Sequence, residues 1–340
     1  MEHAVKGDAW VALCETHPAL RGGLQTALYR LGLRNIEICK DSASLIWLLQ
    51  SQIVDLVICS TDLPGVDFAD LVQQIRHGTI GRNPFTLVVA TIAEPTLEDV
   101  RAVMNAGVDR VALKPMSMAD ISACINALAQ GRKPFVATDS YVGPTRRGPS
   151  RPGQVADVMP APNTLQARFA GDPSEARLEA LIGRGRSAVD TLRLQTSCLA
   201  AARSAQRVAT HFQQRGQAPA PVAPVGKEMS RLRMMSAALG DRYRDSAHAY
   251  LTEIAASLVL LVDLLGDFPA NEMRLMPVAV ELMKKLSEAL RLAGLGDPHA
   301  SATVSSIATA VQGFAATLRV SRADFNARAI VDGSPNLLNG

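Results

Sequence analysis

Polar side chains that could take part in chemistry follow directly on several short apolar runs in the first part of this chain. They are Glu15 and Thr16, Ser60, Thr91 and Lys114. A carboxylate, hydroxyls and an ammonium group are the kinds of side chain that bind or transfer a charged group. They can act on one ligand only if the fold brings the ends of these runs together.

The elements that must position these residues alternate along residues 8–130. Five apolar runs are predicted to be strands: Trp10–Cys14, Ile36–Cys39, Leu56–Cys59, Phe85–Ala90 and Arg110–Leu113. Helical periodicity fills the intervals, at His17–Leu31, Ser42–Leu49, Phe68–Ile75, Leu97–Ala106 and Ala119–Leu128. Strands without polar alternation are buried on both faces, as in parallel sheets. We therefore expect an α/β doubly wound five-stranded parallel sheet, in which ligands bind at the carboxyl ends of the strands.

Three segments give residues 8–130 a resemblance to response-regulator receiver domains of two-component signalling. The run from Asp55 to Gly65, DLVICSTDLPG, is similar to the family's D-L-V-h-h-D-x-x-h-P-G pattern, where h is apolar. Glu15–Pro18, ETHP, stands where the family often has D-D-H-P, and Gly107–Pro115 resembles its segment ending in K-P. The resemblance implies a flavodoxin-like fold. It also implies an acidic pair after the first strand, a phosphoacceptor Asp after the third, Thr or Ser after the fourth, and Lys after the fifth.

The chain departs from that pattern where phosphate chemistry depends on it. Ser60 stands at the phosphoacceptor position, Thr16 replaces one member of the acidic pair, and Val111 occupies the aromatic switch position. A serine hydroxyl is a poor nucleophile without an adjacent base, and Mg²⁺ prefers carboxylate oxygens. We therefore predict a degenerate receiver that is not an enzyme and needs no cofactor. Mg²⁺ would matter only in an active site that used Glu15 and Asp62.

Two alternatives stay open for this site. Asp62, two residues further along the same loop, could accept phosphate, or a Ser/Thr kinase could phosphorylate Ser60. Thr91 and Lys114 also have a purely structural interpretation, since Lys114 could hold an ion pair with Glu15. A neutral Ser60 could equally fix the domain in one conformation.

The remainder of the chain is predicted to be a linker followed by helices. Residues 131–173 are rich in Pro and Arg, and include a Tyr141–Arg147 stretch that resembles a tail found after some bacterial receivers. Residues 174–330 are predicted to form a helical bundle or coiled coil, between tails at 1–7 and 331–340. A heptad seam in the first long helix indicates a coiled coil. Its members are Leu178, Ile182, Gly185, Val189, Leu192, Thr196 and Leu199. His248, expected within a helix, leaves a third and weaker interpretation as a histidine phosphotransfer protein.

Composition narrows the classes of partner. The net charge of +3 over 340 residues is too small to indicate nucleic-acid binding, and no DNA-binding motif is present. The five cysteines show no CxxC spacing, which fits reduced thiols in a cytoplasmic protein. No signal peptide is expected, and the longest apolar stretch, Ile254–Leu265, is too short to cross a membrane. We expect partners such as a histidine kinase or another regulator, and homo-oligomers formed through the helical domain.

Overall fold

The computed structural model divides the chain into two units, residues 1–193 and 194–340, and the boundary falls inside the long helix α7 (Glu175–Arg215). It describes residues 8–146, 158–171, 174–215, 223–266 and 275–331, without the side chains of 215, 223–224 and 321–331. The predicted N-terminal tail, nearly all of the C-terminal tail and the middle of the predicted linker lie outside these ranges.

The first unit is built on the predicted parallel sheet. Its strands are β1 (Trp10–Cys14), β2 (Asn35–Ile38), β3 (Leu56–Ser60), β4 (Leu87–Ile92) and β5 (Arg110–Leu113). They pair in the order β2-β1-β3-β4-β5, the doubly wound order of flavodoxin-like folds. The register sets Cys14 beside Cys59 and Ser60 beside Thr91. The predicted fold class is therefore confirmed, with strand ends displaced by at most two residues.

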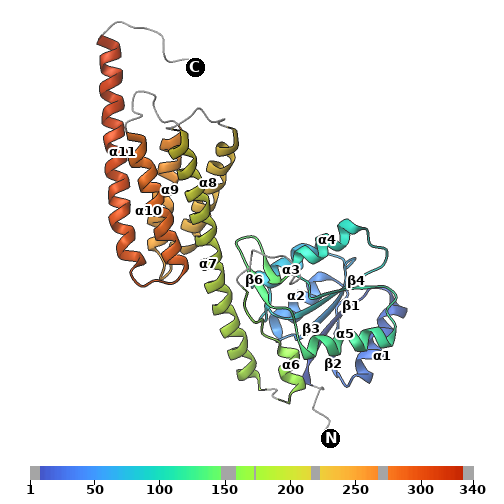
Figure 1. Ribbon diagram of the computed structural model, residues 1–340. Helices are drawn as coiled ribbons and strands as arrows, with labels where there is room; N and C mark the ends of the chain where they lie inside the picture. Colours follow the sequence, from blue (N-terminus) through green and yellow to red (C-terminus); the bar gives the residue numbers. More distant parts are fainter. Residues whose placement is uncertain (1–7, 147–157, 172–173, 216–222, 267–274, 332–340) are drawn as a thin grey trace. The chain divides into compact units, whose positions relative to one another are not determined.

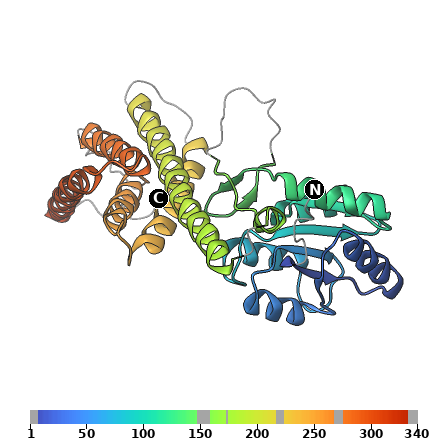
Figure 2. The same ribbon diagram turned by 90° about the horizontal axis from the view of Figure 1, so that it is seen from below.

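Helices cover both faces of this sheet (Figures 1 and 2). Side chains of α2 (Ser42–Ser51), α3 (Phe68–His77) and α4 (Leu97–Ala106) form the core on one face. Those of α1 (Pro18–Arg30) and α5 (Met118–Gln130) form the core on the other. Side-chain caps at the starts of α2, α4 and α5, from Asp41, Thr96 and Ser117, satisfy backbone N–H groups that have no partner inside the helix.

The predicted linker is ordered wherever the structure describes it, which differs from the expectation for residues 131–173. Residues 135–137 (β6) and 142–144 (β7) form an antiparallel hairpin, and 164–169 form helix α6. Phe135 is fully buried, and its backbone pairs with that of Met159. The composition is that of a linker, but apolar residues of the described parts, such as Phe135, Val142 and Met159, are buried in a core cluster of the first unit.

The predicted heptad seam also has a different partner from the one expected. Within the first unit, Leu178, Ile182, Val189 and Leu192 of α7 are buried in a cluster with Phe85 and Phe135. The first half of the seam is therefore covered by the chain's own fold and is not free to pair with a second copy. A Cβ at Gly185 would lie 2.6 Å from Phe85 Cε2 and also overlap Pro162, so this helix packs closely only because position 185 lacks a side chain.

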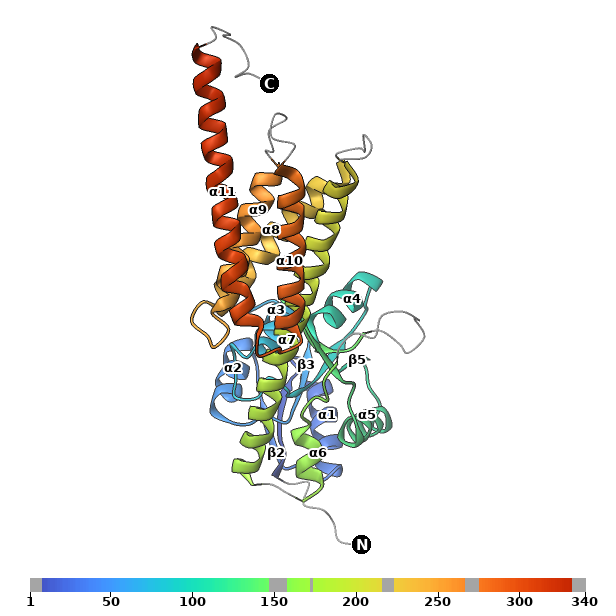
Figure 3. The same cartoon turned by 60° about the vertical axis from the view of Figure 1, so that its left-hand side comes forward.

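The second unit is a helical bundle, as predicted. It contains the end of α7 with α8 (Ala223–Tyr243), α9 (Tyr250–Gly266), α10 (Met276–Gly294) and α11 (Ala300–Val331), whose near-parallel packing is seen in Figure 3. Their shared core is rich in Leu, Ala and Met. Residues 244–249 form a turn between α8 and α9, so His248 lies in a turn and not in the helix that the sequence had led us to expect.

No helix within the described ranges combines the length and apolar character needed to cross a lipid bilayer.

Candidate functional site

Ser60 lies at the carboxyl edge of the sheet, at the end of β3, and its side chain is fully buried. Its Oγ accepts a hydrogen bond from Lys114 Nζ at 2.6 Å and another from the Asp62 backbone N–H at 3.3 Å. Among the described residues, the only carboxylate hydrogen-bonded to the Ser60 hydroxyl is that of Asp62. Its Oδ2 lies 3.5 Å from Ser60 Oγ, at the limit of a hydrogen bond. Ser60 therefore serves mainly as an acceptor for the lysine.

Lys114, which follows β5, joins Ser60 to Glu15. Its Nζ lies 2.9 Å from Glu15 Oε2, and the two side chains are 11% and 2% exposed. Glu15 Oε1 also accepts the His17 backbone N–H at 2.9 Å. The sheet thus assembles a chain of contacts from the ends of β1, β3 and β5, in which a buried carboxylate and a buried hydroxyl hold one ammonium group.

The other residues selected from the sequence lie at this edge with different environments. Thr91 is buried at the carboxyl end of β4, and its hydroxyl has no hydrogen-bond partner among the described residues. Thr16 and Asp62 are exposed, and Val111 in the edge strand β5 is half-buried. The five positions predicted to converge therefore do so, but only Glu15, Ser60 and Lys114 are joined by side-chain contacts.

A small cavity of about 110 Å³ opens beside these residues, between α1 and α5. Glu15, Thr91 and Lys114 form its polar side, and Gly23 of α1 contributes to an otherwise largely apolar lining. An added Cβ at Gly23 would meet no atom within 4 Å, so the space is not filled from the helix side.

Chemically, the arrangement favours holding a fixed charge pair over transferring a group. A serine nucleophile needs a base within hydrogen-bond reach, and the group closest to Ser60 Oγ is an ammonium already paired with Glu15. No set of three or more His, Cys, Asp or Glu side chains among the described residues is placed to hold a metal ion.

A second polar network, not predicted from the sequence, lies at the opposite, amino-terminal end of the strands. Asp109, just before β5, forms buried ion pairs with Arg76 at 2.8 Å and Arg132 at 2.6 Å. Burial lowers the pKa of the Arg76 guanidinium to about 10, although Asp109 opposes the shift. These side chains come from distant parts of the sequence, and no local pattern links them.

Asp55, just before β3, belongs to the same end of the sheet. Its Oδ2 accepts hydrogen bonds from Arg168 Nε at 2.9 Å and from the Trp10 backbone N–H at 2.8 Å. Burial raises the pKa of the Asp55 carboxyl, although Arg168 opposes this shift. Because Arg168 belongs to α6, this contact fastens the segment after residue 130 to the sheet. An Asp directly before an apolar strand was the available signal.

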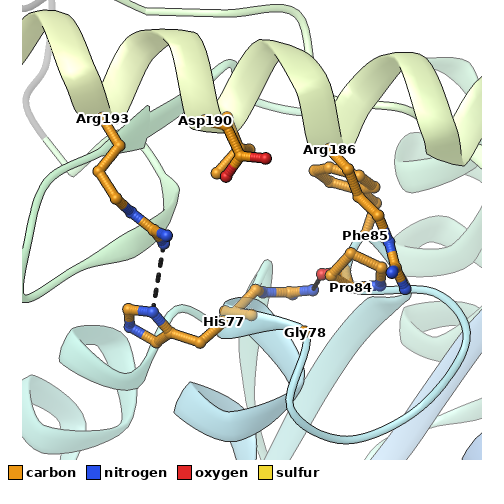
Figure 4. Close-up of a pocket in the computed structure, with 9 residues that line it drawn as sticks. His77, Gly78, Pro84, Phe85, Arg186, Asp190 and Arg193 are labelled. Atoms are coloured by element: carbon orange, nitrogen blue, oxygen red, sulfur yellow. Dashed lines mark hydrogen bonds between the residues drawn. The ribbon is translucent and has the colours of Figure 1, made fainter. Parts of the chain in front are cut away.

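The first part of α7 borders a pocket of about 180 Å³ at this end of the first unit (Figure 4). Arg186, Asp190 and Arg193 of α7 face His77 and Phe85 across it, and Arg193 lies 3.3 Å from His77 Nδ1. The pocket contains no side chain of the Glu15–Ser60–Lys114 site. The pocket lies where the first part of α7 contacts the end of α3.

Comparison with known proteins agrees with this geometry. The family model described as "Response regulator receiver domain" matches residues 11–126. Solved structures similar to part of this chain include the receiver domain of a sensor histidine kinase from Pseudomonas aeruginosa, at 22% identity. It covers 34% of this chain and 93% of that one, with a TM-score of 0.31. The receiver domain of the putative response regulator NarL from Mycobacterium tuberculosis is also 22% identical, covering 37% and 99%, with a TM-score of 0.33.

A CheY-like receiver domain protein from Methanospirillum hungatei is 17% identical and covers 35% of this chain and 91% of its own, with a TM-score of 0.32. The family match covers β2 to β5 and all of β1 except Trp10, and it includes Glu15, Ser60, Thr91 and Lys114 at the carboxyl ends of four of these strands. Residues 11–126 of this chain therefore form a response regulator receiver domain of two-component signalling, and a helical region follows it.

Proposed function

We propose that this domain is a pseudo-receiver, which takes no phosphate at position 60 and acts by binding other proteins through its receiver and helical units. The observation that carries the proposal is the Lys114–Ser60 contact. In a phosphorylatable site the lysine neutralises charge on the transferring group, while a carboxylate makes the attack. Here the lysine donates to a buried neutral hydroxyl and is paired with Glu15.

The residues present do not fit a Mg²⁺ site. Mg²⁺ binds through one or two carboxylates in a near-octahedral shell of oxygens. Glu15 is engaged by Lys114 and by the His17 backbone, Thr16 supplies no carboxylate, and Asp62 is exposed. We propose that the protein works without a cofactor and is not an enzyme.

Receiver domains interact with kinases or other regulators, and this chain offers an apolar surface for such a partner. Leu97 at the start of α4 is 76% exposed and Leu113 in the edge strand β5 is 60% exposed. We infer that the face formed by α4 and β5 binds a histidine kinase or another regulator. None of the five cysteines, all within the described ranges, forms a disulfide, which supports a cytoplasmic location.

Homo-oligomers remain part of the proposal, but the buried half of the heptad seam cannot form them. The helical unit must use another surface, such as the one around Met234 of α8, which is 71% exposed. Light scattering on the full chain over a range of concentrations tests this, and a strict monomer at every concentration contradicts it.

Two rival functions have specific candidates. Asp62 is exposed and lies in the same loop as Ser60, so it is the more accessible acceptor. His248 is half-buried in a turn, edge-on to the rings of Tyr243 and Tyr250. Because a phosphotransfer histidine must project from a bundle helix, this placement favours Asp62 over His248 as the alternative.

Incubation of the full chain with acetyl phosphate and Mg²⁺, read by intact mass, tests the proposal. We expect no phosphoryl group on the wild-type protein. A Thr16→Asp, Ser60→Asp double variant is the matched control, since it restores the two missing carboxylates, and it should gain one phosphoryl group. Stoichiometric phosphorylation of the wild type contradicts the proposal. Its loss in Asp62→Asn would then identify Asp62 as the acceptor, and its loss in Ser60→Ala would identify Ser60.

A further inference from the structure

Three cysteine thiols gather at the carboxyl edge of the sheet, next to the receiver site. Cys14 ends β1, Cys59 precedes Ser60 in β3, and Cys39 is the first residue after β2. All three are buried in the same core cluster, on the face covered by α2, α3 and α4. The register places Cys59 beside Cys14 on the β3 side, and Cys39 follows the strand on the other side of β1.

A metal site does not explain this cluster, because the described residues include no group of His, Cys, Asp and Glu placed to bind an ion. We propose instead that Cys14 and Cys39 form a reversible disulfide when the protein meets a hydroperoxide. The structure thus assigns a redox modification site to this edge of the receiver. The inference does not rest on the absence of phosphate chemistry at Ser60.

Backbone geometry places the two residues within bridging distance. The register of β1 with β2 pairs Leu13 with Ile38, and the Cys39 N–H donates to Leu13 O at 3.0 Å. The next pair along is therefore Cys14 with Cys39. Neighbouring strands lie about 4.8 Å apart, which falls inside the range of about 4.4–6.8 Å that disulfides span between Cα atoms.

Cys39 is a better partner for Cys14 than Cys59. Cys14 and Cys59 are held in register inside two central strands, with parallel side chains, and Cys59 Sγ also donates to Ser60 O at 3.2 Å. Cys39 lies beyond the end of an edge strand and is followed by exposed Lys40 and Asp41. Its side chain can therefore rotate toward Cys14 without disturbing a strand on each side.

The pKa values of the Cys14 and Cys39 thiols also differ in the direction that disulfide formation requires. A hydrogen bond from Cys14 lowers the pKa of the Cys39 thiol, although burial opposes this. Hydrogen bonds with Cys39 and Cys59, together with burial, raise the pKa of Cys14. Because Cys39 also follows the edge strand and precedes exposed Lys40, we assign the attacking sulfur to Cys39 and the second sulfur to Cys14.

The reaction balances with a hydroperoxide as the oxidant. The Cys39 thiolate attacks the terminal peroxide oxygen and the O–O bond breaks, which leaves a Cys39 sulfenic acid. The departing hydroxide (or alkoxide, from an organic hydroperoxide) takes up a proton to give water (or an alcohol). Cys14 then loses its proton, and its sulfur attacks the sulfenic sulfur and expels the oxygen as water. Two thiols are oxidised to one disulfide, and one peroxide is reduced. Because Cys14 directly precedes Glu15, the bridge forms next to the carboxylate that holds Lys114.

Stoichiometric hydrogen peroxide on the native full chain, followed by acid quench, denaturation and maleimide labelling, tests the proposal. The chain has five cysteines, so the reduced protein takes five labels and the bridged protein three. Peptide mapping should find Cys14 joined to Cys39, and dithiothreitol should restore all five labels. Tryptophan fluorescence before the quench verifies that the protein is still folded.

Two variants separate the cluster members. The Cys59→Ala variant should still form the Cys14–Cys39 disulfide. The Cys39→Ala variant has four cysteines and lacks the nucleophile, so it should still take four maleimide labels after oxidation. The wild-type map decides the matter even if a variant does not fold. Five labels, a bridge that includes Cys59, Cys124 or Cys198, a bridge between chains, or a singly oxidised Cys39 would each overturn the assignment.

Discussion

Replacing Gly185 by alanine tests how α7 is held on the receiver, and Gly183 two residues away provides a control in the same helix. A Cβ at Gly185 would lie 2.6 Å from Phe85 Cε2 and overlap Pro162, whereas one at Gly183 would meet no atom within 4 Å. The two substitutions therefore share the change in helix propensity and differ in the steric overlap.

The expected magnitudes follow from these two terms. Glycine to alanine inside a helix stabilises it by about 1 kcal/mol. Overpacking a close contact costs about 1–3 kcal/mol. Gly183→Ala should therefore raise the free energy of unfolding by about 1 kcal/mol. Gly185→Ala should leave it unchanged or lower it by up to about 2 kcal/mol, so that the two variants differ by about 1–3 kcal/mol.

Urea unfolding followed by tryptophan fluorescence measures this difference in the right part of the molecule. The chain has two tryptophans, Trp10 and Trp47, and both belong to the receiver. Equal stabilisation by the two substitutions would refute the close packing of α7 at Gly185. It would also mean that the chain's own fold does not cover the first half of the heptad seam.

Two further predictions concern ion pairs and caps of the same unit. Asp109→Asn should lower the free energy of unfolding by about 3–5 kcal/mol, because it leaves the buried Arg76 and Arg132 without their counter-ion. As a control, Asp190 is exposed, so Asp190→Asn should change the free energy of urea unfolding by less than about 0.5 kcal/mol. Equal effects of the two substitutions would contradict a stabilising role for the ion pairs of Asp109. Hydrogen bonds from the hydroxyl and N–H of Thr96 lower the pKa of Asp99, so its stabilising effect is present above the ordinary Asp pKa and is lost as pH falls through the lowered value. The Asp99→Asn variant should therefore have a lower free energy of unfolding than the wild type at pH 7. This difference should shrink toward about pH 3, near the acid end of the range in which carboxylates titrate. A difference that does not change with pH would argue against the stabilising role of the cap.

Much of the receiver was accessible from sequence because its signals are local. Uninterrupted apolar runs identify buried strands, and helical periodicity between them identifies crossovers, so order and sheet type follow. The same logic placed Glu15, Ser60, Thr91 and Lys114 at one edge, because the carboxyl ends of parallel strands meet there. The Lys114–Glu15 ion pair, one of the interpretations left open, is present at 2.9 Å.

The features that the sequence did not predict depend on contacts between residues far apart in the chain. The segment 131–173 has the composition of a linker because its apolar residues are few, yet Arg168 reaches Asp55 across 113 positions of sequence and fixes it to the sheet. The heptad seam indicates only that one face of α7 is apolar. Whether a second helix or the chain's own hairpin covers that face is not encoded in the spacing.

The sequence alone determined the receiver fold, the edge where its polar residues converge, and the presence of Ser60 at the end of the third strand, since each depends on residue type and local period. Only the tertiary structure decided which side chains meet: Lys114 with Ser60 and Glu15, Asp109 with two arginines, and Cys39 beside Cys14. Such pairings depend on strand register and on packing between elements far apart in the chain, and these are fixed only when the whole unit folds.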